Sequence, residues 1–307
     1  MTNNCKKTAC CKVDKKTCSF YKTRFLFIST ILLASFITIS SPVKAQTSDF
    51  EVGMINVGSG SVIGGIGAVI NKRDDEKVIP VLLKGMAQGA LGGYAVFESK
   101  RLVRVFARTE DYNYVWPSKI LNAAGNSIIE NAASNRKLWD QWHLNLGFTR
   151  LEVSTEDGFK IKYKIKPFSL YGAVQAWRGH RSDWNKSLKL GTLVFNFSEL
   201  ESNGNHLRGA TLYDHIVLLD NNRSPLQTEA HELVHIYQIH QFSGVNSYFN
   251  PIYYPLKRKS KVFAIYDHIF YTDWNNPLYT YLANLNNNGS DPKKVNLFER
   301  EAYYLID

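Results

Sequence analysis

The sequence predicts an α+β protein that combines a glycine-rich helical hairpin, a mostly antiparallel sheet and a helical C-terminal part. Three observations predict this fold class. Glycine recurs at four-residue intervals in residues 46–115, apolar and polar residues alternate within residues 116–223, and apolar residues recur at helical spacing in residues 224–307. Together, residues 46–307 are numerous enough for one large domain or two small ones.

Residues 1–45 have the composition of a targeting segment rather than of a folded domain. Seven lysine and arginine residues precede an apolar and hydroxyl-rich run at residues 25–41, and a small-residue signal-peptidase site ends at Ala45. A run of this length is short for a permanent membrane span. We therefore expect a signal peptide cleaved after Ala45, with an uncleaved anchor in the inner membrane through residues 25–41 as the alternative.

The leader holds most of the excess positive charge and all four cysteines. The chain has 37 basic and 27 acidic residues, of which residues 1–45 hold eight and one, so residues 46–307 keep 29 against 26 and a net charge of +3. This small excess excludes nucleic acid as an expected partner. Export from a bacterial cytoplasm, to the periplasm or cell envelope, fits a cysteine-free body, since secreted eukaryotic domains more often carry disulfides.

The first region predicts two helices that approach each other closely. Its regularly spaced glycines are at positions 60, 64, 85, 89 and 93. Glycine at this interval permits close contact between helix backbones, as in pairs of membrane helices. Polar residues 71–77 would form the turn of this hairpin. Either the hairpin packs within the protein or residues 52–97 dip into one leaflet, so membrane association through them or through the N-terminal segment stays open.

The second region predicts one helix followed by strands. Apolar residues at helical spacing favour a helix over residues 118–142. Three later segments favour strands, at residues 159–165, 188–197 and 210–219. In the first of these, lysine alternates with apolar residues. We expect that stripe to be a solvated face of the sheet, and it consists of Lys160, Lys162 and Lys164.

The motif HELVH, which begins at His231, carries the clearest chemical signal in the chain. On a helix, positions i and i+4 share one face, so His231 and His235 can hold one metal ion while Glu232 acts as a general base. Helix-start signals begin at Ser224, and a helix stop is expected at Gly244. Uncharged neighbours favour this interpretation over one in which both histidines only border the polar edge of an amphipathic helix.

A catalytic zinc takes three protein ligands, so the motif needs a third. The metzincin pattern is excluded because Gln238 and Gln241 stand where that family has glycine and histidine. With HELVH upstream, the C-terminal run from Asn296 to Tyr303 resembles the gluzincins, zincin peptidases whose third ligand is a glutamate on a second helix. The resemblance covers two short segments within residues 224–307, which would form a zincin-like metal-binding region.

The resemblance implies one Zn²⁺ ion per chain, held by three side chains and served by one base. The ligands would be His231, His235 and Glu299, and the catalytic base would be Glu232. Glu301 stays open as the third ligand in place of Glu299. Residues two apart on a helix point in different directions, so only one of these two glutamates can face the metal.

The same family pattern gives three further expectations. Tyr303 stands where family members often have an aspartate that orients a ligating histidine. In zincins an edge strand beside the metal-binding helix binds extended substrate, and residues 210–219 are the expected strand. His268 or Tyr266 could donate a hydrogen bond to the oxyanion of the transition state.

We therefore expect an exported zinc-dependent hydrolase of peptide or amide bonds that acts on a peptide or protein substrate. The same ligands could serve hydrolysis of a lipid or sugar amide. The main alternative is a non-catalytic cell-envelope protein whose metal site is structural or decayed. The oligomeric state does not follow from the sequence.

Overall fold

The computed structural model describes residues 48–306 apart from 157, 199–200, 203–204, 207, 221–224 and 286–295. The chain divides into two units, residues 1–45 and residues 46–307, and every described residue belongs to the second. The predicted leader, with its apolar run at residues 25–41, lies outside the described residues. Helices combined with small, mainly antiparallel sheets confirm the α+β class.

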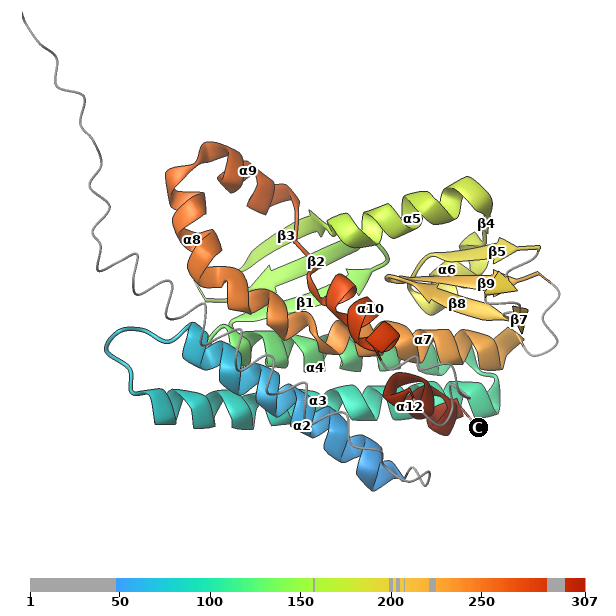
Figure 1. Ribbon diagram of the computed structural model, residues 1–307, viewed down its shortest axis with the longest axis horizontal. Coiled ribbons are helices and arrows are strands. Elements are labelled where there is room, and N and C mark those ends of the chain that lie inside the picture. The colour runs from blue at the N-terminus through green and yellow to red at the C-terminus, as the bar shows by residue number, and fades with distance from the viewer. Residues whose placement is uncertain are drawn as a thin grey trace, which may run out of the picture. The chain divides into compact units, whose positions relative to one another are not determined.

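Two long helices, α2 (Asp49–Ile70) and α3 (Val78–Thr109), form the predicted hairpin and run antiparallel (Figure 1). A Cβ atom on Gly60 would overlap the carbonyl oxygen of Gly89, so side chains are excluded where the two backbones cross. By length and composition α2 could cross a membrane, yet its glycine-bearing face packs against α3. The third helix of this layer, α4 (Val115–Ala133), packs against both.

The first sheet contains three antiparallel strands in the order β1-β2-β3. These strands are β1 (Gln141–Leu146), β2 (Thr149–Ser154) and β3 (Lys160–Ile165). The predicted helix over residues 118–142 was therefore too long, because the chain leaves α4 after Ala133 and turns back at Asn135. Asn135 has φ of 55°, a left-handed conformation that ends a helix.

The lysine stripe of β3 does not lie on a simple solvated face. Ile161 and Tyr163 are 59% and 62% exposed, whereas Lys164 is buried. Lys164 Nζ lies 3.4 Å from Glu152 of β2, in a layer of buried charge centred on Arg150. The strand was predicted correctly, and Lys160 and Lys162 are exposed as expected. The expectation was wrong for Lys164 alone, because this charge layer draws its side chain inward.

The second sheet has the strand order β4-β5-β9-β8 and is antiparallel except between β5 and β9. Its strands are β4 (Arg181–Ser182), β5 (Val194–Phe197), β8 (Gly209–Leu212) and β9 (His215–Leu219). Two strands of two residues each, β6 (Glu201–Ser202) and β7 (Asn205–His206), pair with each other and lie between β5 and β8 in the chain. Helix α5 (Pro167–Gly179) packs against this sheet.

Two strand predictions in this region need correction. Residues 188–197 begin as the end of α6 (Trp184–Leu190), and Gly191, with φ of 62°, separates that helix from β5. Residues 210–219 form a hairpin instead of one strand, because Tyr213 adopts φ of 55° between β8 and β9. The hairpin makes β8 one of the two outer strands of the sheet, with β4 at the other edge.

The remaining described residues are mainly helical. They include α7 (Pro225–Gln241), η3 (Ser243–Phe249), α8 (Asn250–Lys259), α9 (Lys261–Ile269), α10 (Asn275–Leu285) and α12 (Leu297–Ile306). Helix α7 begins at Pro225, as the sequence indicated. It ends at Gln241, before the expected stop at Gly244, which instead lies within η3. It lies between α3 and the second sheet, and α12 packs against both α7 and α3 (Figure 1).

Candidate metal centre

Helix α7 holds both histidines of the HELVH motif rigidly. Leu233 and Val234 are fully buried in the core shared by α3, α7 and the second sheet, which fixes the rotation of the helix. The imidazoles of His231 and His235 lie one turn apart, with ring centroids separated by 4.7 Å. Their Nε2 atoms are 3.1 Å apart and face the same side of the helix.

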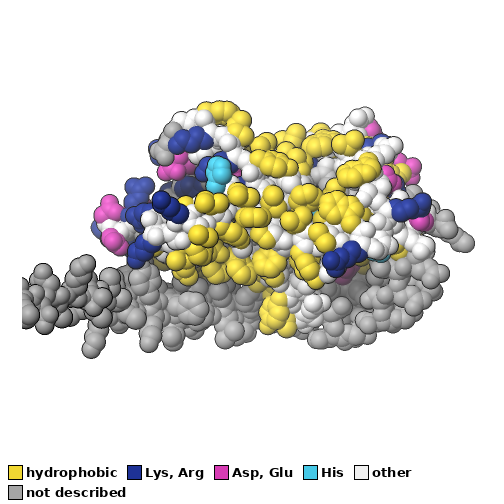
Figure 2. Space-filling view, turned by 90° about the horizontal axis from the view of Figure 1, so that it is seen from above, with side chains coloured by type: hydrophobic (Ala, Val, Ile, Leu, Met, Phe, Trp, Pro, Cys, Tyr) yellow, Lys and Arg dark blue, Asp and Glu magenta, His cyan; other side chains and the backbone are white. Residues whose placement is uncertain are grey.

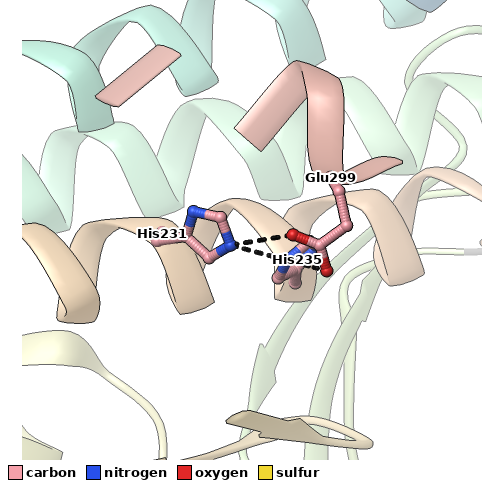
Figure 3. A group of neighbouring side chains, drawn as sticks. All are labelled: His231, His235 and Glu299. Atoms are coloured by element: carbon pink, nitrogen blue, oxygen red, sulfur yellow. Dashed lines mark hydrogen bonds and ion pairs between the residues drawn. The ribbon is translucent and has the colours of Figure 1, made fainter. Parts of the chain in front are cut away.

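Glu299 of α12 completes a group of three converging side chains (Figure 3). Its Oε2 lies 3.2 Å from His231 Nε2, and its Oε1 lies 3.3 Å from His235 Nε2. Ligand atoms around a tetrahedral zinc with bonds of about 2.0–2.1 Å are separated by about 3.3 Å. Two imidazoles and a carboxylate at this spacing are therefore a donor set that fits Zn²⁺.

The structure separates the two glutamates that the sequence left open. Glu301 turns away from the imidazoles and is buried, with Oε1 2.9 Å from Lys100 Nζ. Asn56 Nδ2 donates a second hydrogen bond to the same oxygen at 2.7 Å. Lys100 and Asn56 of the α2–α3 hairpin bind the Glu301 carboxylate. Of the two glutamates, only Glu299 therefore lies beside the histidines.

Gln238 connects His235 to this buried group. Its Nε2 donates to Glu301 Oε2 at 2.8 Å and to the Phe298 carbonyl oxygen at 2.9 Å. These two acceptors orient the amide so that Oε1 faces His235 Nδ1, 2.8 Å away. An oxygen there requires a proton on Nδ1, so Nε2, which faces Glu299, is the nitrogen that can give up its proton and bind a metal. The hydroxyl of Tyr279 also lies within hydrogen-bonding distance of His235 Nδ1 and Gln238 Oε1.

The electrostatics of the group favour an ionised carboxylate. Burial acts to lower the pKa of His235, but the hydrogen bond and charge of Glu299 outweigh it and raise that pKa to about 9. Burial likewise acts to raise the pKa of Glu299, while hydrogen bonds from His231 and His235 hold it well below its usual range. A bound cation would take the place of the proton shared within this group.

Glu232 follows His231 on α7, and its carboxylate lies beside the second sheet. Thr211 of β8 places its hydroxyl 2.8 Å from Glu232 Oε2, where it can donate a hydrogen bond. Gly209 lies beside the same side chain, since a Cβ at that position would lie 3.3 Å from Glu232 Cγ. The outer strand β8 therefore borders the general-base candidate.

Other predicted contributors lie elsewhere. Tyr266 is hydrogen-bonded to Thr272 at 2.9 Å and lines a separate cavity, and His268 is exposed on α9. The expectation that either lies at the centre was wrong, because α9 packs against α8 and β3 rather than α7. Tyr303 places its ring 4.6 Å from that of His231.

Sequence reasoning missed Gln238, Tyr279 and Thr211 as neighbours of the motif. The spacing of Gln238, three residues after His235, places both on one helix face and could have identified it. No local signal marks the other two residues, which come from α10 and β8. Comparison with protein-family models, with curated proteins and with solved structures finds no match to this chain.

Proposed function

We propose that this protein is a zinc-dependent hydrolase of peptide or amide bonds. The convergence of His231, His235 and Glu299 from two helices, at separations that suit one tetrahedral ion, is the observation that supports the proposal most strongly. The position of Glu232 beside the group, buried and hydrogen-bonded by Thr211, adds a base. The ligands occupy three positions and leave a fourth for chemistry.

Each residue has a role that follows from its position. Zinc held by the three ligands would supply a Lewis acid for a carbonyl oxygen and for water. Glu232 would accept a proton from the attacking water and pass it to the leaving nitrogen. Gln238 would keep His235 in the tautomer that presents Nε2. Thr211 would orient the Glu232 carboxylate between these proton transfers.

The outer strand β8 supports a peptide as the substrate class. Among the described strands only β9 pairs with β8, so the opposite backbone edge of β8 can accept an extended chain by hydrogen bonding. A peptide added along this edge would run past Thr211 and therefore past Glu232. Because residues 1–45 are expected to form an export leader, we place this activity in the periplasm or envelope of a bacterial cell.

Replacement of Glu232 tests the mechanism directly. Glu232→Gln keeps the size of the side chain and removes the base, so the variant should bind about one zinc per chain and lose hydrolysis. Turnover equal to that of the unchanged protein would contradict the role of Glu232. Zinc far below one per chain in the unchanged protein would instead favour a non-catalytic envelope protein.

The substrate class needs a second measurement. Peptide libraries and non-peptide amides, assayed with and without a chelator, separate a peptidase from a hydrolase of lipid or sugar amides. We expect chelator-sensitive cleavage of peptides. Cleavage of non-peptide amides alone would assign the same centre to a different substrate.

A further inference from the structure

A cavity lies between the first sheet and the α8–α9 pair, and none of the metal-centre residues lines it. It has a volume of about 330 Å³, within the range of small-ligand sites. The lysine side of β3 forms one wall, and Phe263 and Tyr266 of α9 form another. The segment that follows α9 is joined to β3 here, because Tyr271 N donates to the Ile165 carbonyl oxygen at 2.9 Å.

The acidic groups deep in this cavity are already neutralised. Arg150 is fully buried and binds Glu130 at 2.9 Å and Glu152 at 2.8 Å. At the other wall, Lys257 Nζ lies 2.6 Å from Asp267 Oδ1. These carboxylates therefore have little remaining capacity to attract a cation.

Three cations that line the cavity have no carboxylate partner among the described residues. These cations are Lys160, Lys162 and Arg136. The Arg136 guanidinium donates hydrogen bonds to the neutral side chains of Gln141 and Ser134. The exposed Glu156 is the sole lining carboxylate, within the described part, that lacks a basic partner. The cavity thus carries excess positive charge and suits an anion.

The outer surfaces of both walls are apolar. Strand alternation turns Ile161 and Tyr163 away from the cavity as Lys160 and Lys162 turn into it. On α9, Val262 and Ile265 are 75% and 60% exposed. Figure 2 shows hydrophobic side chains gathered over this side of the molecule, with basic side chains near its α8–α9 end.

An apolar surface of this kind marks a site of contact with another hydrophobic body. The segment before the exposed stripe of α9 is strongly basic, and its residues are Lys257, Arg258, Lys259 and Lys261. Basic residues next to exposed aliphatic and aromatic side chains match the chemistry of an anionic membrane surface, where phosphates lie beside acyl chains. An isolated inorganic anion would leave the apolar surface uncovered.

We propose that the cavity binds the phosphate headgroup of an anionic phospholipid, while the exposed apolar side chains of α9 contact its acyl chains. Lys160, Lys162 and Arg136 receive the phosphate, and Val262 and Ile265 lie in the apolar layer. This site would hold the protein on the membrane surface by a folded face distinct from residues 25–41. The inference does not depend on the hydrolase activity.

Short-chain soluble phospholipids test the site in the full chain, because the leader is then common to every variant. Titration calorimetry with dihexanoyl phosphatidylglycerol should show binding that is about tenfold weaker or more for dihexanoyl phosphatidylcholine and for inorganic phosphate. Lys160→Gln combined with Lys162→Gln should weaken phosphatidylglycerol binding about tenfold, and Val262→Asn combined with Ile265→Asn about fivefold.

The matched control combines Leu188→Asn with Lys189→Gln on α6, which also replaces one exposed apolar and one exposed basic residue. It should change binding by less than about twofold. Equal binding of phosphatidylcholine would overturn headgroup selectivity, and equally tight binding of phosphate would overturn the acyl-chain contact. Unchanged binding in both cavity and surface variants, with unfolding curves unaltered, would place any lipid site elsewhere.

Discussion

Gln238 Oε1 lies 2.8 Å from His235 Nδ1. The opposite amide orientation is excluded, because it would place Oε1 against two other acceptors, the Glu301 carboxylate and the Phe298 carbonyl oxygen. One side chain thus determines which imidazole nitrogen of His235 is free to bind a metal. The same contact links the candidate centre to Lys100 in the glycine-rich hairpin through Glu301.

Replacement of this amide should weaken zinc binding. In Gln238→Met the side chain keeps a similar volume but no longer accepts the Nδ1 proton, so we expect the dissociation constant to rise about 10- to 100-fold. Competition with a chromogenic chelator measures this change. The control is Gln227→Met, at an exposed position of the same helix. Equal zinc affinity in both variants would show that Gln238 has no role in orienting His235.

The two glutamates of α12 should respond in opposite ways. Glu299→Gln removes a charged ligand, so zinc affinity should fall about 100-fold or more while the metal-free fold persists. Glu301→Gln leaves Lys100 buried without a counter-charge, which should lower the free energy of unfolding by about 3–5 kcal/mol. Zinc titration and chemical unfolding of both variants test this contrast. A reversed pattern would make Glu301 the ligand.

The features that the sequence predicted correctly depend on short-range patterns. HELVH places His231 and His235 on one face of any α-helix, and the helix start at Pro225 reflects local backbone preferences. The hairpin was predictable for a similar reason, because glycine spacing already implies close helix contact. In each case, residues within a few positions of one another determine the outcome.

The features that were missed depend on residues distant in sequence. Apolar spacing continues past Ala133, so it could not show that Asn135 ends the helix. The orientation of β3 follows from Arg150 and the charges that surround it, which no pattern in that strand reveals. The sequence already favoured Glu299 over Glu301 through the family resemblance. The ion pair between Glu301 and Lys100, some two hundred residues earlier, could not be predicted from either glutamate's neighbours in the sequence.

The contact between α2 and α3 should be intolerant of even one methyl group. In Gly89→Ala the new Cβ would overlap the Gly60 carbonyl oxygen, a backbone atom that cannot rotate aside. We therefore expect the free energy of unfolding to fall by about 3 kcal/mol or more. Gly58→Ala, with open space around its Cβ, should instead stabilise the helix by about 0.5–1 kcal/mol. Chemical denaturation of both variants gives the comparison. Similar effects in both would contradict the close packing.

Stability should decrease as the pH falls below neutrality, in part through His215. Burial lowers the pKa of this imidazole from 6.5 to about 4, although its hydrogen bond to the Ser169 carbonyl acts in the opposite direction. Between these values the unfolded chain binds a proton that the folded protein does not. The stabilisation is therefore complete above pH 6.5 and is lost as the pH falls toward 4, up to about 3 kcal/mol.

Substitution isolates this contribution. His215→Gln retains a donor for the Ser169 carbonyl without a titrating ring, so the loss of unfolding free energy between pH 7 and 4 should become smaller by about 2–3 kcal/mol. The control, His268→Gln, changes an exposed imidazole and should leave the pH dependence as it was. Urea unfolding at several pH values measures the slopes. The same slope in all three proteins would exclude His215 as a source of acid sensitivity.

Thr211 offers a test of whether β8 assists catalysis or only packs beside α7. Its hydroxyl is 2.8 Å from Glu232 Oε2 and 3.0 Å from the Glu232 carbonyl oxygen, so Thr211→Val removes the donor that orients the carboxylate. Because a hydrogen bond to a charged group contributes about 1.5–3 kcal/mol, we expect kcat to fall about tenfold or more. Zinc affinity should be unchanged, since no ligand is altered. Thr211→Ser keeps the hydroxyl and should retain most of the activity, and if the valine variant turns over as fast as the serine variant, the threonine serves packing alone.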